Sequence, residues 1–313
     1  MKRVLTAVVL IPLVLLIVFK APLWLFALAV AGIIWLALHE YLGIAEAAEV
    51  KPFRCATYVA ALLPIIVLLG TLVLSEWQSH PRRYHDYPAV GLQRGFTILC
   101  FLLPVIFGTL LVFRKDLKGG LASVASSAFG VLYIGVSLSV LIALRADFVE
   151  RILVIVVMFS VWAGDIAAYY VGRSIGRHKL APIVSPNKSW EGAVASVIGS
   201  VIVAAVVLHY GTQINSWFSD RFGFSMGPVT FYTPSRTVDV TIFHAILLGI
   251  FTNVAAQFGD LFESALKRGA GVKDSGTLLP GHGGILDRID ALLFAIPVVW
   301  YYANLTGFLQ PKF

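Results

Sequence analysis

The sequence predicts an all-α integral membrane protein, a polytopic bundle of about nine transmembrane helices. Hydrophobic residues make up 58% of its 313 residues and charged residues only 13%, against about 25% charged residues in typical soluble domains. Apolar runs close to the ~20 residues that span a bilayer as a helix recur along the chain. Short polar segments separate these runs, so the chain is expected to cross the membrane repeatedly.

The first apolar run, residues 4–19, follows Lys2 and Arg3. At about 1.5 Å per residue it reaches roughly 24 Å, less than a ~30 Å hydrocarbon core, so whether it crosses fully is left open. A signal peptide is not expected, because no small-residue cleavage site follows and a second apolar run begins soon after Lys20.

The other expected spans are residues 22–38, 55–74, 95–113, 121–144, 152–171, 192–210, 240–261 and 289–309. Residues 39–54, which mix charged residues with alanine, are expected to form a short helix at the membrane interface. The loops 76–94 and 211–239 are expected to be solvated connectors. Residues 1–150 are expected to hold the N-terminal transmembrane helices, about five spans, and residues 151–313 the catalytic transmembrane region.

The distribution of Lys and Arg predicts the orientation. With the N-terminus inside, the inner segments hold 15 and the outer segments 9 of the 24 Lys and Arg residues, and cytoplasmic loops carry such an excess. The loops 172–191 and 262–288 are therefore expected to be cytoplasmic active-site loops, where nucleoside triphosphates are available. The net charge of +7 suits anionic lipids and a polyanionic substrate. No nucleic-acid partner is expected, because the charges are spread over short loops.

The most distinctive stretch is residues 264–290, which is polar although it lies between two apolar runs. It holds six glycines together with His282, the acidic residues Asp274, Asp287 and Asp290, and the basic residues Lys267, Arg268, Lys273 and Arg288. Such a mixture suits the binding of magnesium and phosphates. The stretch contains neither a Walker loop nor a dinucleotide-binding fingerprint.

Polar residues also form one stripe along the helix expected at residues 240–261 and just beyond it. They recur at helical spacing as Asn253, Gln257, Asp260, Ser264 and Lys267. For Asn253 and Gln257 the favoured interpretation is hydrogen bonding between helices. For Asp260 a functional role is favoured, because an ionisable group near the end of a membrane helix indicates a functional site.

Asp287 and Asp290 share one face if the last helix begins near them, where the helix dipole alone would favour carboxylates. Magnesium is often held by one or two carboxylates together with substrate phosphates, and Asp260 and Asp287 can supply that pair. His282, Gly283 and Gly284 are expected to form a tight turn whose backbone amides approach phosphate oxygens.

Two interpretations remain open for Asp165, late in the span 152–171. It binds a metal or a nucleotide, or it pairs with Lys188 or Arg288. Ser189 is an expected helix N-cap, and Lys188 is expected to be a phosphate-binding charge.

These residues resemble the signature of the phosphatidate cytidylyltransferases, the CDP-diacylglycerol synthases. The matching positions are Ser264, Lys267, Arg268, Lys273, Asp274, Ser275, Gly276, Pro280, His282, Gly283, Gly284, Asp287, Arg288 and Asp290. The segment 185–192 and the run from Asp165 through Tyr169 to Gly172 also look like that family. The resemblance is dense from about residue 165 to residue 297 and thin before that.

The resemblance implies that a phosphate oxygen of phosphatidic acid attacks the α-phosphorus of CTP, which yields CDP-diacylglycerol and pyrophosphate for phospholipid biosynthesis. It implies a nucleotidyltransferase of the bacterial inner membrane that meets CTP, phosphatidic acid and membrane lipids and uses Mg²⁺. A second cation and a homodimer are left open. No general base is required, because a phosphate monoester with a second pKa near 6 is largely ionised at neutral pH.

The resemblance also implies roles for individual residues. The catalytic set is Lys267, Arg268, Lys273, Asp274 and Arg288. The substrate- and phosphate-binding set is Lys188, Ser189, Ser264, Ser275, His282, Gly283 and Gly284. The metal ligands are Asp260, Asp287 and Asp290, with Asp165 as an additional candidate.

Three alternatives remain. A membrane lipid kinase acting on a polyprenol or dolichol would share the architecture, but the full match from Lys273 to Asp290 argues against it. A transporter would explain the many spans, although the sequence has neither paired broken helices nor symmetric halves. A catalytically inactive scaffold is expected to lack part of the signature, and none of it is missing.

Overall fold

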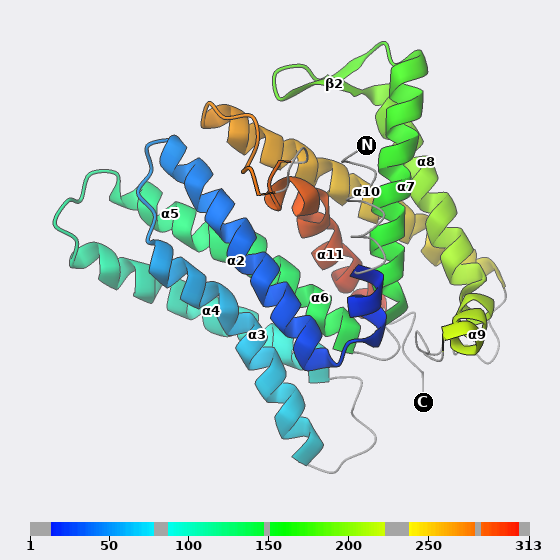
Figure 1. Cartoon of the computed structure of the whole chain (residues 1–313), viewed down its shortest axis with the longest axis horizontal. Coiled ribbons are helices and arrows are strands. Elements are labelled where there is room, and N and C mark those ends of the chain that lie inside the picture. Colours follow the sequence, from blue (N-terminus) through cyan, green and yellow to red (C-terminus); the bar gives the residue numbers. More distant parts are fainter. Residues whose placement is uncertain (1–13, 78–86, 147–150, 223–237, 279–282, 307–313) are drawn as a thin grey trace. The chain divides into compact units, whose positions relative to one another are not determined.

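A computed structural model of the chain describes residues 14–77, 87–146, 151–222, 238–278 and 283–306 (Figure 1). The chain divides into two compact units, and each unit is built from two separate stretches of sequence. The first unit comprises residues 1–146 and 266–289, and the second comprises residues 147–265 and 290–313.

The first unit contains a series of apolar helices. They are α2 (Leu23–Ala47), α3 (Arg54–Trp77), α4 (Tyr87–Val112), α5 (Gly120–Gly130), the π-helical turn η2 (Val131–Val136) and α6 (Ser137–Ala146). Leu38, Phe107 and Ile134 are among the fully buried side chains of this unit. Gly135 in η2 lies against α3, since a Cβ there would come within 2.9 Å of Ala61.

The second unit combines helices with one small hairpin. Its elements are α7 (Arg151–Ile175), the antiparallel strands β1 (Lys179–Ala181) and β2 (Ser185–Ser189), α8 (Trp190–His209) and α9 (Gly211–Phe222). Two further helices, α10 (Val238–Gly269) and α11 (Leu286–Thr306), contribute residues to both units. The α10–α11 loop, residues 270–285, carries most of the signature.

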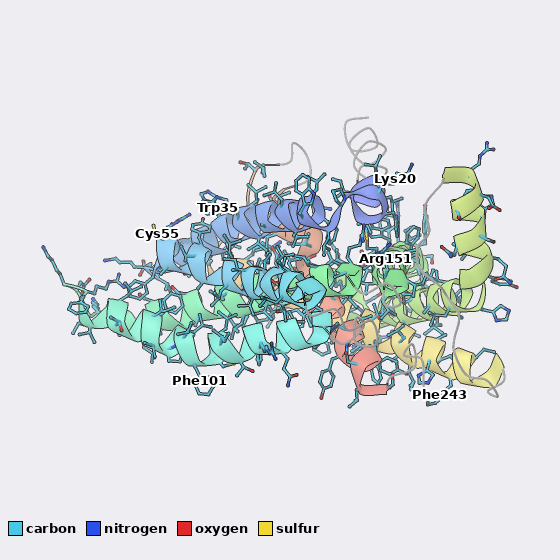
Figure 2. All side chains as sticks on the ribbon, turned by 90° about the horizontal axis from the view of Figure 1, so that it is seen from below. Lys20, Trp35, Cys55, Phe101, Arg151 and Phe243 are labelled. Carbon is cyan, nitrogen blue, oxygen red and sulfur yellow. The ribbon has the colours of Figure 1, made fainter. Side chains whose placement is uncertain are left out.

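Eight helical segments of the described residues are long and apolar enough to cross a membrane. Large apolar side chains also lie on their outer surfaces, such as Trp35 on α2, Phe101 on α4 and Phe243 on α10 (Figure 2). Soluble proteins rarely expose so much apolar surface, whereas lipid covers it without cost. The predicted all-α polytopic architecture is confirmed, and ten residues of the expected span 4–19 lie outside the described residues.

One expectation about the first unit is wrong. Residues 39–54 do not form a separate short helix, because α2 continues without a break to Ala47 and α3 begins at Arg54. Several of the charged residues that suggested an interfacial helix have contacts within the protein. Arg54 donates a hydrogen bond to Glu46 at 2.7 Å, and Glu40 is buried.

Candidate active site

A cavity of about 450 Å³ lies in the second unit, lined by residues of α7, β1, β2, α8 and α10. Its polar lining consists of Asp165, Tyr169, Arg173, Asn187, Lys188, Ser189, Ser196, Asn253, Gln257 and Asp260. Four residues that the sequence predicted as site residues, Asp165, Lys188, Ser189 and Asp260, are therefore brought together although up to 95 positions separate them along the chain.

Lys188 and Asp260 form an ion pair at this cavity. The Nζ atom of Lys188 lies 2.5 Å from Oδ2 of Asp260, and the hydroxyl of Ser264 donates to Oδ1 at 3.4 Å. The two charged side chains are 27% and 36% exposed, so both remain accessible from the cavity. Lys188 thus pairs with Asp260, while Asp165 on α7 faces the same cavity and adds a second carboxylate.

Local hydrogen bonds explain the position of Lys188. Ser189, the next residue, is the N-cap of α8, and its hydroxyl accepts the N–H of Gly192 at 3.2 Å, as the sequence predicted. Glu191 accepts from the backbone N–H of His178 at 3.2 Å, which joins the start of α8 to the segment before β1. Both bonds lie where β2 meets α8, so they fix the hairpin at the end that carries Lys188.

The polar stripe of α10 connects this helix to α8. Asn253 donates to the hydroxyls of Ser196 at 2.9 Å and Ser200 at 2.7 Å. Gln257 donates to the carbonyl of Ala193 at 3.1 Å and to Oδ1 of Asn253 at 2.5 Å. Bonding between helices, the interpretation favoured for these two amides, is confirmed, and the same bonds fix the helix that carries Asp260.

A second cluster lies in the first unit around Asp287. Lys267 on α10 pairs with Oδ1 of Asp287 at 2.5 Å, and the side chains are only 11% and 9% exposed. The backbone N–H groups of Ser275 and Gly284 donate to Oδ2 at 3.1 and 2.8 Å. Gly283, with φ of 77°, supplies the left-handed turn that brings the amide of Gly284 to this carboxylate.

Asp287 therefore closes the α10–α11 loop. It lies in the first turn of α11, where the helix dipole favours a carboxylate. In this conformation each of its oxygens accepts a hydrogen bond, from Lys267 or from the backbone of the loop. The tight turn expected at Gly283 and Gly284 is present, and its amide meets a carboxylate of the protein.

Sequence reasoning missed Glu40, which contacts the same loop from α2. Its carboxylate accepts the hydroxyl of Ser275 at 2.9 Å and the backbone N–H groups of Ile285 and Leu286 at 2.9 and 2.8 Å. The signal was present, because a lone acidic residue that continues a long apolar run marks a functional position. This role of Glu40 was not predicted because residues 39–54 were expected to form an interfacial helix.

The remaining predicted residues are spread along the loop and its flanks. Lys273 and Asp274 are exposed, and Arg268 donates to the carbonyl of Val272 at 3.5 Å. Arg288 and Asp290 lie in the first two turns of α11. His282 lies outside the described residues.

The donor atoms of the cavity fit a magnesium ion that is completed by substrate. Among the described residues no group of three or more His, Cys, Asp or Glu side chains is arranged to hold a metal by itself. Magnesium, however, is usually bound by one or two carboxylates plus phosphate oxygens and water. Asp165 and Asp260 offer such a pair of carboxylates to one cavity.

Known proteins match this chain over nearly its whole length. Residues 1–306 match the model of the Cytidylyltransferase family. The phosphatidate cytidylyltransferase of Haemophilus influenzae is 30% identical over 308 residues, 96% of this chain and 97% of the relative. The proteins of the same name from Synechocystis and Bacillus subtilis are 29% identical over 309 residues (90% of this chain, 89% of the relative) and 32% identical over 238 residues (75% and 77%). The chain therefore belongs to the cytidylyltransferase family.

Proposed function

We propose that this chain is a phosphatidate cytidylyltransferase, which transfers the cytidylyl group of CTP to phosphatidic acid. An oxygen of the lipid phosphate forms a bond to the α-phosphorus of CTP. The bond from that phosphorus to the bridging oxygen of the β-phosphate breaks, so pyrophosphate leaves and CDP-diacylglycerol remains. The observation that carries the proposal is the cavity with Lys188, Asp165 and Asp260, found in a chain whose full-length relatives carry that enzyme name.

The chain's own residues supply charge and position in this reaction. The ammonium of Lys188 neutralises the triphosphate. Its ion pair with Asp260 and the N-cap formed by Ser189 keep Lys188 at the cavity. Neutralising and orienting phosphates is the main requirement of such a transfer, because the attacking oxygen is already ionised. No step requires a nucleophilic side chain.

Magnesium is part of the proposal. Asp165 and Asp260 would hold it, with Asp287 and Asp290 as further proposed ligands. When bound, the ion supplies Lewis-acid stabilisation of the charge that develops on the triphosphate. Asp287 would have to exchange its bonds to Lys267, Ser275 and Gly284 for the metal.

The α10–α11 loop is proposed to contact the substrate phosphates. Its cationic side chains and amides provide donors for anionic oxygens. The proposed set is Ser264, Lys267, Arg268, Lys273, Asp274, Ser275, His282, Gly283, Gly284 and Arg288.

The proposed location is the bacterial inner membrane, with the site open to the cytoplasm. The excess of Lys and Arg in the segments assigned to the inner side supports this orientation. The bond from Ser275 to Glu40 supports one common side for the segments 39–54 and 262–288, which the same count assigns to the cytoplasm. A homodimer and a second cation remain predictions.

The decisive test is turnover by purified protein with labelled CTP and phosphatidic acid. CDP-diacylglycerol should form in a magnesium-dependent reaction, and CTP or dCTP should be used far better than ATP or GTP. The variant Lys188→Gln should lose most of this activity, whereas Lys179→Gln, an exposed lysine of the same hairpin, should retain it. Equal use of ATP, with transfer of its γ-phosphate to a lipid, would favour the lipid kinase instead.

A further inference from the structure

A buried carboxylate from the first part of the chain lies at the centre of the signature. Glu40 is 7% exposed, although it sits in a long apolar helix. It accepts three hydrogen bonds, from the hydroxyl of Ser275 and from the amides of Ile285 and Leu286, which are 235, 245 and 246 positions away in the sequence. Burying a carboxylate is costly unless such donors surround it, so the site is built for this group.

Two glycines of the loop leave the space that this carboxylate occupies. A Cβ on Gly276 would lie 2.6 Å from Oε1 of Glu40, and a Cβ on Gly284 would overlap both Oε2 of Glu40 and the hydroxyl of Ser275. Neither glycine has a positive φ, so backbone conformation does not require glycine there. The close approach of Glu40 accounts for both.

The bonds to Glu40 continue directly into the cluster around Asp287. Ser275 donates its hydroxyl to Glu40 and its backbone N–H to Asp287. Ile285 and Leu286, whose amides bind Glu40, immediately precede Asp287 in the chain. The described parts of the loop are thus held between two carboxylates, and a shift of Glu40 would move Ser275 and the start of α11 together.

We infer that Glu40 is a positioning residue for the transfer reaction, acting through Ser275 and the first turn of α11 to hold the α10–α11 loop in its working conformation. The inference rests on the proposed function for the reaction itself. The negative charge matters because it faces two amides at a helix N-terminus, where the dipole favours an anion. Without the full carboxylate, the N–H groups of Ile285 and Leu286 and the hydroxyl of Ser275 compete for fewer acceptor oxygens.

The test compares matched variants of α2. Glu40→Gln keeps the size of the side chain but replaces one acceptor oxygen by a donor, whereas Glu40→Asp keeps the charge on a shorter stem. Glu46→Gln is the control, since Glu46 lies in the same helix and pairs with Arg54 at 45% exposure. Loop order is measured as the rate at which a thiol reagent labels Leu286→Cys, a 0% exposed position just after the loop, in a background without Cys55 and Cys100.

Glu40→Gln should lower kcat for CTP by about tenfold or more, which is the size of effect a misplaced catalytic loop produces. It should also raise the labelling rate at Leu286→Cys by about threefold or more, because the loop opens locally more often. Glu40→Asp should show smaller changes in both kcat and the labelling rate, and Glu46→Gln should match the parent in both. If Glu40→Gln does not fold, Ser275→Ala, which removes one partner of the carboxylate, should raise the labelling rate in its place.

Three outcomes would overturn the inference. Unchanged labelling in both Glu40→Gln and Ser275→Ala would show that the carboxylate does not order the loop. If a variant kept its kcat although its loop was labelled faster, an ordered loop would not be needed for transfer. If Glu40→Gln lowered KM for CTP and left kcat unchanged or higher, the carboxylate of Glu40 would be opposing the binding of the CTP phosphates instead of positioning the loop. Failure of the proposed function can be distinguished from failure of this inference. In that case the parent protein would not turn over CTP, whereas the labelling rate would still report whether Glu40 orders the loop.

Discussion

At the scale of single residues, Asp287 has two roles that compete for the same carboxylate oxygens. It is a counter-ion for Lys267 and an acceptor for two backbone amides, which together close the α10–α11 loop. It is also a proposed magnesium ligand. Both roles need its negative charge, so the isosteric amide is the informative replacement.

We expect Asp287→Asn to insert and fold but to lose transfer activity by about 100-fold or more, since charge stabilisation supplies most of the catalysis of such a reaction. Initial rates with CTP, measured across a magnesium titration, report this loss. Ser275→Ala in the same loop should cost less. Near-normal, magnesium-dependent turnover by folded Asp287→Asn protein would contradict the metal assignment.

Asp260→Asn should reduce activity to a similar extent. If the two aspartates hold one metal together, the double variant should be scarcely slower than either single variant, because residues that act as one unit are not additive. A double-mutant cycle on kcat measures this. Fully additive losses would mean that Asp260 acts separately, as the partner of Lys188.

Residues whose role follows from a local sequence pattern, such as a cap or helical spacing, were the ones that the sequence predicted well. Ser189 caps the helix that follows it, and Asn253 and Gln257 bond across helices as their spacing suggested. Glu40 could not be predicted in the same way, because all three of its donors lie more than 230 positions away. Asp287 was placed correctly at a helix start, but its role in closing the loop depends on Gly283 and Ser275 folding back to it.

At the scale of elements, the close packing of α7 and α8 positions the cavity (Figure 1). Small residues make this approach possible, as in many membrane helix pairs. A Cβ on Gly199 of α8 would lie 3.1 Å from the carbonyl of Ala163. A Cβ on Gly164 of α7 would come within 2.9 Å of the hydroxyl of Ser200 and would also press on Asn253 and Ser196.

Gly164→Ala should therefore destabilise the protein by about 1–3 kcal/mol, the usual cost of an inserted methyl group in a packed interior. Thermal unfolding in detergent measures this as a lower Tm. Gly32→Ala is the matched control, because Gly32 lies within α2 and has no atom within 4 Å of an added Cβ. That variant should be neutral or stabilised by up to about 1 kcal/mol. Equal Tm values for the two variants would contradict the packing argument.

The helices were predictable because apolar length alone decides whether a segment spans a membrane. The exceptions depend on contacts or on weak local signals. Residues 39–54 were expected to form a separate short helix because they carry charges, yet α2 continues to Ala47, and Glu40 and Glu46 have partners within the protein. The β1–β2 hairpin and α9 were not predicted, since their few residues show neither a clear strand alternation nor a long apolar run.

At the scale of the whole molecule, each compact unit is built from two stretches that lie apart in the sequence. The loop that carries most of the signature groups with the first 146 residues, whereas Lys188 and Asp260 group with the second unit. The predicted division at residue 150 concerned the location of catalytic residues, and it stays a prediction. The two groups of proposed residues can therefore be tested separately for exposure to one side of the membrane.

Single cysteines at Lys179 and Thr277, in a background without Cys55 and Cys100, should react with impermeant thiol reagents only from the cytoplasmic side. Both positions are exposed. Thr277 is preferable to its neighbour Gly276, where any side chain would collide with Glu40. Labelling of either cysteine from outside intact cells would rule out a site formed by both loops on the cytoplasmic side.

The bonds of Glu40 also have a consequence for biosynthesis. Glu40 leaves the ribosome 235 residues before Ser275 does, which at about 5–20 residues per second is a delay of roughly 10–50 s. During that time its carboxylate is part of an apolar helix whose later partners do not yet exist. Every nascent chain therefore passes through an interval in which this buried acidic group lacks its final donors. A message that is cut short before α11 yields a membrane fragment in which Glu40 never gains them.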